Sequence, residues 1–181
     1  MDSTNPNQPR MITGVFKDRE SAEHAYRSIH ERGYDKDDVN LVMSDDTRKR
    51  YFETRDDDTV ADTELGSKAL EGAGAGAGIG GTVGAVAAAI AAIGTSLAIP
   101  GLGLVVAGPI AAALAGAGAG GLTGGLIGAL VGSGIPEERA KEYEDDVKNG
   151  GIVMAVRPRS DDDARYLEQS WRDNRGERIH Y

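Results

Sequence analysis

Residues 72–94 have the sequence GAGAGAGIGGTVGAVAAAIAAIG, a run of small and aliphatic residues in a chain that is 27% charged. A small residue recurs there at every fourth position, and the same spacing returns between residues 112 and 132. On a helix, such a series leaves one face nearly bare, so that another helix can approach closely. We therefore predict two glycine-zipper helices whose packing and oligomerisation positions are Gly72, Gly76, Gly80, Gly84, Ala88, Ala92, Ala112, Gly116, Gly120, Gly124, Gly128 and Gly132.

A segment rich in proline and glycine, IPGLGLVVAGP at residues 99–109, separates the two series. Because proline and glycine favour turns, this segment predicts the apex of a helical hairpin over residues 72–135. The arms are expected at 72–98 and 109–133, and each reaches the roughly 20 residues that cross a bilayer. The predicted turn residues are Pro100, Gly101, Gly103, Gly108 and Pro109.

No charged residue occurs from Gly72 to Pro136, whereas charged residues crowd both ends of this segment. Each glycine destabilises a water-exposed helix by about 1 kcal/mol relative to alanine, so packing or lipid must stabilise the hairpin. We favour membrane insertion as a pair or multimer, because the first arm has few large aliphatic side chains and is marginal alone. The alternatives are a soluble assembly that buries the hairpins against each other and, less favoured, a self-contained monomer.

The segment before the hairpin predicts half of an α+β domain, over residues 11–47. A short apolar strand is followed by Asp18 as a helix N-cap, and Gly33 is well placed to end that helix. Residues 39–43 form a second apolar run, which predicts a strand. Residues 1–10 are expected to be a disordered tail, and residues 48–71 predict a charged connector, in which residues 49–68 form either a loop or the beginning of a long helix.

The segment after the hairpin, residues 136–181, predicts the other half of the domain. Pro136 lies near the first turn of a helix, residues 152–156 form an apolar strand, and Ser160 opens a helix with a capping box completed by Asp163. The final residues, ERIHY, predict an edge strand. This order indicates a split βαβ, ferredoxin-like domain that is interrupted by the long hairpin.

Composition and motifs exclude several classes of function. The net charge of −9 and pI of about 4.8 argue against a nucleic-acid partner. Gly76, Gly78 and Gly81 match G-x-G-x-x-G, but no strand precedes them and no acidic residue follows at the required distance, so no cofactor is expected. His24 and His30 face different directions on one predicted helix, and no cysteine is present, so no metal site and no catalytic residue is predicted.

Two motifs resemble the small bacterial general stress proteins, which include heat-induced and low-temperature-induced members. The pattern I-P-G-x-G followed by G-I-P-E-x-x-A-x-x-Y occurs at residues 99–103 and 134–143. GVFKDRESAEHAYRSIHERGYDKDDVNLVMSDD, residues 14–46, is similar to the N-terminal module of that family. The resemblance covers most of the chain from Met11 to Tyr181. It implies a stress-associated protein that is membrane-associated or oligomeric, with no catalytic residues.

These observations lead us to expect a non-enzymatic structural protein whose hairpin self-associates in or on the cell membrane. Its partners would be other copies of itself and the lipid, with no nucleic acid and no identified small-molecule substrate. Because the start of the chain has no apolar signal region, the α+β domain is expected in the cytoplasm. The alternative is a cytoplasmic, soluble scaffold or filament, and a weaker one is a small-ligand sensor built on the α+β domain.

Overall fold

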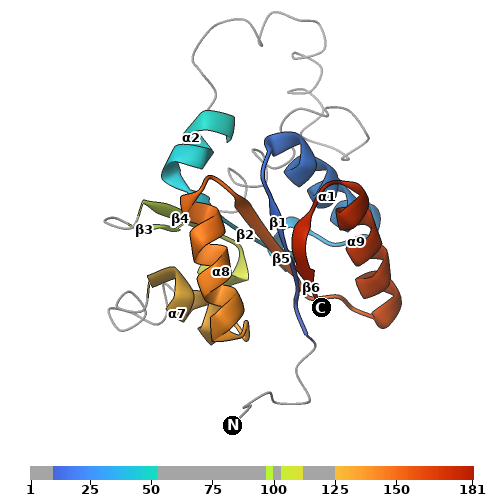
Figure 1. The fold of residues 1–181 in the computed structure, drawn as a ribbon. Coiled ribbons are helices and arrows are strands. Elements are labelled where there is room, and N and C mark those ends of the chain that lie inside the picture. The colour runs from blue at the N-terminus through green and yellow to red at the C-terminus, as the bar shows by residue number, and fades with distance from the viewer. Residues whose placement is uncertain (1–9, 53–96, 100–102, 112–124) are drawn as a thin grey trace, which may run out of the picture.

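The structure is a computed structural model, and it describes residues 10–52, 97–99, 103–111 and 125–181. In this part of the chain one antiparallel sheet has the strand order β3-β4-β2-β5-β1-β6 (Figure 1). Its strands are β1 (Ile12–Phe16), β2 (Val39–Ser44), β3 (Leu97–Ile99), β4 (Leu104–Ala107), β5 (Ile152–Val156) and β6 (Glu177–His180). The described protein is therefore a mixed α+β structure.

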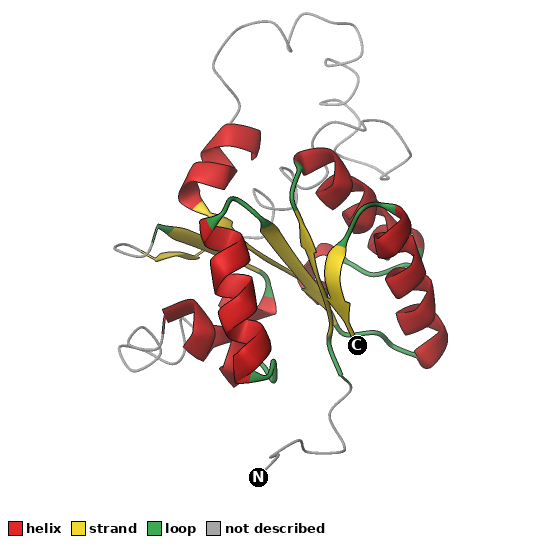
Figure 2. Cartoon of the chain, viewed as in Figure 1, coloured by secondary structure: helices red, strands yellow, loops and turns green. Residues whose placement is uncertain are grey.

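Strand β5 joins the two halves of the chain, because it pairs with β1 on one side and with β2 on the other. Ile12 lies opposite Val156 in the first pairing, and Val39 lies opposite the same Val156 in the second. Every residue of β1 and of β5 is buried. Such continuous burial is typical of strands whose two faces are both covered, and here helices cover them (Figure 2).

Helices α1 (Arg19–Glu31) and α9 (Asp161–Asp173) cover one face of the sheet. Phe16 and Trp171 meet edge to face in this layer, with ring centroids 5.5 Å apart, and both side chains are fully buried. Gly14 allows this packing, since a Cβ at that position would lie 2.9 Å from the Trp171 ring. The layer thus depends on an aromatic side chain from the last helix and on strand β1 from the start of the chain.

Helices α7 (Gly125–Gly132) and α8 (Glu137–Lys148) cover the opposite face. Side chains of β1, β2, β4 and β5 meet both helices there in a second apolar cluster, which includes Val15, Val42, Val106, Leu126, Leu130, Tyr143, Val147 and Val153. Helix α2 (Asp45–Phe52) follows β2 and contacts β2 and β4, and the short 3-10 helix η1 (Lys36–Asp38) leads into β2. The described elements therefore form three layers, helix, sheet and helix.

The local predictions for the flanking segments are confirmed. Asp18 caps α1, since its carboxylate accepts a hydrogen bond from the Ser21 backbone N–H over 2.8 Å. Gly33 follows the end of α1 with φ of +75°, a conformation that glycine adopts at low cost. Ser160 caps α9 by accepting from the Asp163 backbone N–H. The edge strand predicted at the end of the chain is β6.

The predicted boundary at residue 47 lies inside helix α2. Helix α2 runs through it from Asp45 to Phe52, so the first part of the predicted connector 48–71 belongs to the packed domain. The Asp45 carboxylate forms ion pairs with Arg48 and Lys49, which lie one turn further along this charged helix. The rest of the connector and the tail of residues 1–9 lie outside the described residues.

The predicted apex of the helical hairpin is wrong where the structure describes it. Leu104–Ala107 form strand β4, which pairs with β2, and Leu97–Ile99 form strand β3 beside it. The physical reason is that β2 offers unpaired backbone groups along its free edge, and the run of leucine and valine in residues 104–106 favours a strand. The segment therefore extends the sheet of the α+β domain, and residues 97–98 do not end a helical arm.

The predicted second arm, 109–133, is not one continuous helix. Gly125 has φ of +58°, which a right-handed helix cannot accommodate, and α7 begins at this residue. Ile110 and Ala111 near the start of the arm belong to the same apolar cluster as Leu126 and Leu130 near its end. Both described ends of the arm are thus part of the domain core, because the large aliphatic side chains at these positions gain more from burial there than from exposure.

No helix within residues 10–52, 97–99, 103–111 and 125–181 is both long enough and apolar enough to span a membrane. The first predicted arm, apart from residues 97–98, lies outside these ranges, as does the part of the second arm at residues 112–124.

Candidate functional site

Of the predicted zipper positions, Gly128 and Gly132 lie within the described residues, both on α7. The remaining positions, from Gly72 to Gly124, lie outside them. Both described glycines are exposed, and a Cβ placed on either would meet no atom within 4 Å. Val131, which lies between them in sequence, is 42% exposed. We call these three residues the α7 glycine face.

The other side of α7 is packed. Leu126 and Leu130 are fully buried, and Ala129 is nearly so, in the cluster that α7 shares with α8 and the sheet. An eight-residue helix thus has one apolar side anchored in the domain and another apolar side left open. Substitutions on the α7 glycine face can therefore be made without displacing atoms of the core.

The predicted turn residues have other roles than the apex of a helical hairpin. Gly103 precedes β4 with φ of +60°, and its carbonyl accepts a hydrogen bond from the Asp45 backbone N–H. Gly108 has φ of +94°, and a Cβ there would lie 2.2 Å from the Val39 carbonyl oxygen. Pro109 begins a helical turn at residues 109–111. Pro100 and Gly101 lie outside the described residues.

Asn40 in β2 links that strand to Ile110, after β4, and to Ala155 in β5. It was not identified as an important residue from the sequence. Its side chain is 3% exposed and accepts a hydrogen bond from the Ile110 backbone N–H over 2.8 Å, while its amide donates to the Ala155 carbonyl. The only available signal was an asparagine inside an otherwise apolar strand. Its partner, seventy positions along the chain, could not be identified from sequence alone.

A second polar group lies between α8 and the sheet. The hydroxyl groups of Thr13 and Tyr143 lie 2.6 Å apart, and the Tyr143 hydroxyl also donates to the Arg178 carbonyl over 3.3 Å. Both Thr13 and Tyr143 are buried, and burial raises the pKa of the Tyr143 phenol, an effect that the hydrogen bond from Thr13 opposes. The contact fixes α8 to β1.

Arg178 in β6 connects that edge strand to α8. Its guanidinium forms ion pairs with Glu142 over 2.9 Å and with Asp146 over 3.0 Å. Its φ of +46° is unusual for a residue with a side chain, and the register between β1 and β6 shifts in this part of the pairing. The irregular backbone directs the guanidinium to α8. Burial raises the pKa of the Asp146 carboxyl, and the Arg178 charge opposes this effect.

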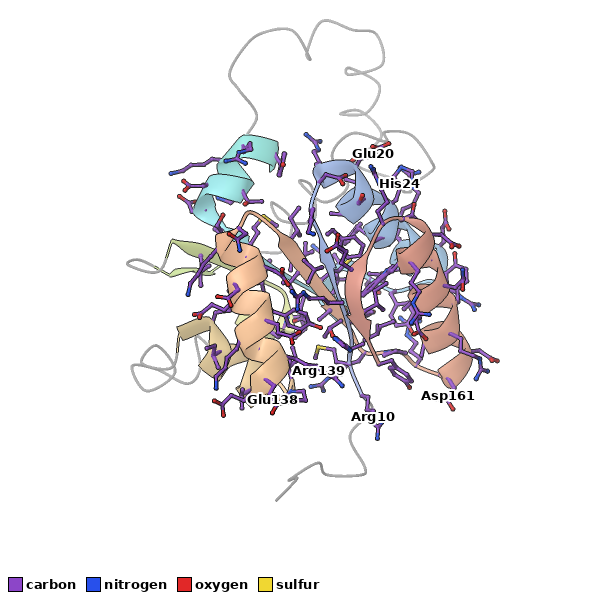
Figure 3. All side chains as sticks on the ribbon, in the orientation of Figure 1. Arg10, Glu20, His24, Glu138, Arg139 and Asp161 are labelled. Carbon is purple, nitrogen blue, oxygen red and sulfur yellow. The ribbon has the colours of Figure 1, made fainter. Side chains whose placement is uncertain are left out.

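A hollow of about 280 Å³ lies at the N-terminal end of α8, and we call it the α8 hollow. Arg10, before β1, and Arg139, in the first turn of α8, are among the residues that line it, and they lie at the same end of the molecule (Figure 3). Neither forms a hydrogen bond or an ion pair with another residue in the described part of the chain. The remaining lining comes from Met11, Thr13, residues 134–136 and Tyr181.

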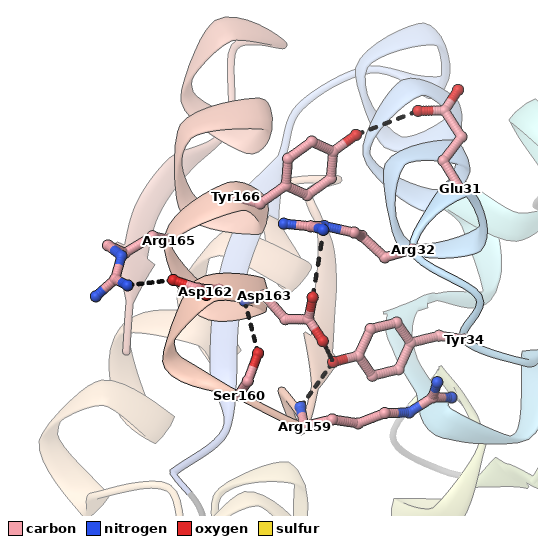
Figure 4. Close-up of polar contacts among 9 residues, drawn as sticks. All are labelled: Glu31, Arg32, Tyr34, Arg159, Ser160, Asp162, Asp163, Arg165 and Tyr166. Carbon is pink, nitrogen blue, oxygen red and sulfur yellow. Dashed lines mark hydrogen bonds and ion pairs between the residues drawn. The ribbon is translucent and has the colours of Figure 1, made fainter.

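A polar network on the other side of the molecule links α1 to α9 (Figure 4). The Tyr34 hydroxyl donates to the Asp163 carboxylate over 2.8 Å and accepts from the Arg159 backbone N–H over 2.7 Å. Arg32 forms an ion pair with the same carboxylate over 3.4 Å, and the Arg159 guanidinium lies 4.1 Å from the centre of the Tyr34 ring. Every polar group of this network is engaged within the protein, so we assign it a structural role.

No cluster of potential metal ligands occurs among residues 10–52, 97–99, 103–111 and 125–181. His24 and His30 are exposed on α1, and His30 contacts the Tyr34 carbonyl through Nδ1. His180 lies in β6, far along the chain from both. The α7 glycine face is therefore the first feature in the described residues that we consider for function.

Comparisons of the chain with protein-family models, with curated proteins and with solved structures found no match in any of the three.

Proposed function

We propose that this is a non-enzymatic structural protein that self-associates through its glycine-rich segments. The observation that carries the proposal is the α7 glycine face, which is apolar and exposed and continues the four-residue series of small positions that begins at Ala112. A backbone without side chains allows another helix to approach closely, and a second copy of the chain offers a matching surface. The resemblance to bacterial general stress proteins supports a role under stress.

In this proposal, the α+β domain anchors the glycine-rich segments. Residues 53–96 follow α2 and precede β3, and residues 112–124 follow the helical turn after β4 and precede α7. All of these flanking elements lie on the β3–β4 side of the sheet (Figure 1). The domain would therefore present both segments from one side of the molecule, which favours their joint contact with a partner.

We further propose that the domain is a split ferredoxin-like fold with an added hairpin. Four of its strands follow the order β2-β5-β1-β6, and helices α1 and α9 connect β1 to β2 and β5 to β6. Both connecting helices lie on the same face of the sheet. This arrangement supports the βαβ-βαβ pattern inferred from the sequence. Strands β3 and β4 extend the sheet beyond β2.

Assembly in or on a membrane, with the α+β domain in the cytoplasm, is supported by the length of the charge-free segment from Gly72 to Pro136. A soluble assembly is the second candidate, and the position of β4 favours it. A hairpin that crosses the bilayer would place its apex far from the domain, whereas residues 104–107 are hydrogen-bonded to β2. Fractionation without detergent separates the two, since a large soluble particle supports the second candidate and a detergent-requiring protein supports the first.

Self-association is tested with a Gly128→Leu, Gly132→Leu double variant of the full chain. Two leucines on the α7 glycine face fill the space that a neighbouring helix would occupy, and we expect a loss of crosslinked oligomers. The matched control is Gln169→Leu, which adds an exposed leucine to α9 on the other side of the sheet. Circular dichroism of each variant checks that the fold is retained.

The proposal fails if the unmodified chain is monomeric at micromolar concentration in both buffer and detergent. It fails equally if the double variant and the control give the same crosslinked species as the unmodified chain.

A further inference from the structure

A hollow of about 270 Å³ adjoins the α7 glycine face, and we call it the η1 hollow. Gly132, which belongs to that face, is one of the residues that line it, together with Asp37 in η1 and Arg157 directly after β5. The antiparallel pairing of β2 with β5 brings these last two residues to the same place, because Val39 lies opposite Val156. The hollow therefore continues the open surface of α7 to one end of the central strands.

Asp37 and Arg157 have opposite charges and no ionic partner in the described part of the chain. Both residues are exposed, and neither side chain forms a hydrogen bond or an ion pair with another described residue. They do not pair with each other, although they line the same hollow. The neighbouring Asp38 differs, since its carboxylate forms an ion pair with Arg159 over 3.1 Å. The η1 hollow thus presents one negative and one positive group that are separate from each other.

Apolar surface lies beside these two charges. Val131, next to Gly132 in α7, is 42% exposed, and Met11 and Pro109 also line the η1 hollow. Burial of apolar surface contributes affinity when two proteins associate, whereas charged groups mainly fix the orientation of the partner. The α7 glycine face and the η1 hollow together contain both kinds of group.

The arrangement of the charges favours a second copy of the chain over a partner of one charge sign. An acidic partner would be repelled by Asp37, and a basic partner would be repelled by Arg157. In a dimer with two-fold symmetry the same surface of both copies meets, so each contact occurs twice with the roles exchanged. A two-fold axis that passes between Asp37 and Arg157 places each residue opposite its counterion in the other copy.

We propose that two copies of the chain bind each other through the α7 glycine face and the η1 hollow, with Asp37 of each copy paired with Arg157 of the other. This inference rests on the proposed self-association, and it specifies the symmetry and the charged contacts of that association. The two α7 helices approach each other at Gly132, where the absence of a side chain permits close contact.

The test uses two charge-reversal variants of the full chain, Asp37→Arg and Arg157→Asp, under conditions in which the unmodified chain associates. Each variant alone places like charges opposite each other at both contacts. We expect its dissociation constant, measured by sedimentation equilibrium, to rise about tenfold. An equimolar mixture of the two variants has opposite charges at both contacts again, so it should associate about as tightly as the unmodified chain.

The matched controls are Asp173→Arg and Arg172→Asp, which change the net charge by the same amounts. Both positions are exposed at the end of α9, on the other face of the sheet. Neither control should change the dissociation constant, and mixing the two controls should have no effect. Circular dichroism of all four variants checks that the fold is retained.

Three outcomes contradict the proposal in different ways. If both charge-reversal variants associate as tightly as the unmodified chain, the symmetric contact is overturned while self-association stands. The contact is also overturned if the mixture associates no more tightly than either variant alone, or if the controls weaken association equally. If the unmodified chain does not associate at all, the proposed function fails, and the symmetric contact fails with it.

Discussion

Gly108 combines two constraints that only glycine satisfies. Its φ of +94° is unfavourable for a residue with a Cβ, and that Cβ would also lie 2.2 Å from the Val39 carbonyl oxygen. Gly134 has the same φ of +94°, but a Cβ there would meet nothing within 4 Å. The two positions therefore separate the cost of backbone conformation from the cost of a steric clash.

We predict that Gly108→Ala destabilises the protein much more than Gly134→Ala does. The Gly134 variant should lose about 1–2 kcal/mol of unfolding free energy, the usual cost of a left-handed conformation. The Gly108 variant should lose at least as much again, because β2 or the chain after β4 must move. Urea denaturation of both variants measures the difference, and equal losses would show that the contact with Val39 does not constrain the chain.

Single residues were the least predictable level of this structure. Gly108 was predicted as a turn residue from the glycine and proline content of residues 99–109. Its close approach to Val39 depends on the pairing of β4 with β2, which the sequence alone did not reveal. Asn40 acts through a partner distant in the chain, the Ile110 backbone N–H. Local patterns contain no information on such pairs.

The elements of the flanking segments were predictable because their determinants are local. Helix α9 begins where Ser160 accepts a hydrogen bond from the Asp163 backbone N–H, and both residues lie within one turn. The Asp163 side chain, by contrast, was expected to complete the capping box and instead accepts a hydrogen bond from Tyr34. Tertiary contacts thus replaced half of the local motif, while the start of the helix remained as predicted.

Strands β3 and β4 were missed because the glycines and prolines around them, in residues 100–109, favour turns, and that signal outweighed the short apolar runs. Residues 104–107 are bounded by Gly103 and Gly108, which is a typical pattern for a short buried strand. The expectation of one long hairpin led to the wrong interpretation. Continuity of a zipper pattern in sequence does not require continuity of the helix, as Gly125 demonstrates.

We predict that Ser160→Ala lowers the unfolding free energy by about 1 kcal/mol, because an N-terminal backbone N–H of α9 loses its acceptor. Ser170→Ala, in the last part of the same helix, is the matched control. It should leave stability nearly unchanged, since alanine is a better helix former than serine. Thermal melts of both variants measure the effect, and equal shifts in Tm would contradict a capping role for Ser160.

The whole molecule is held by contacts between its two ends, on both faces of the sheet. Trp171 packs on Phe16 in one layer, and Tyr143 contacts Thr13 in the other. The α+β class followed from the alternation of predicted strands and helices. The third layer could not be predicted, because α7 lies inside the segment that the zipper pattern had assigned to a separate hairpin.

Buried phenols make the molecule sensitive to high pH. Burial raises the pKa of Tyr143 and of Tyr34 in the folded protein above the ordinary value of about 10. The unfolded chain then loses these protons at lower pH than the folded chain does, so unfolding is favoured as pH rises. The stabilisation is complete below pH of about 10 and is lost as pH increases towards the raised values.

We predict that Tyr143→Phe reduces this loss. At neutral pH the variant should be less stable by about 1 kcal/mol, since the Thr13 hydroxyl loses its partner. Above pH of about 10 the difference should become smaller, because phenylalanine has no proton to lose. Urea denaturation at a series of pH values measures both effects, and a constant difference across the series would show that Tyr143 titrates normally.

The pairing of β5 with both β1 and β2 has a consequence for synthesis on the ribosome. Residues 12–16 and 39–44 emerge well before residues 152–156, the strand that joins them. Until then the nascent N-terminal half has apolar strand edges without their native partner, and such edges are prone to aggregate. Chaperones that cover unpaired β-strands would be needed most during this interval, and the native sheet closes only after residues 152–156 have been made.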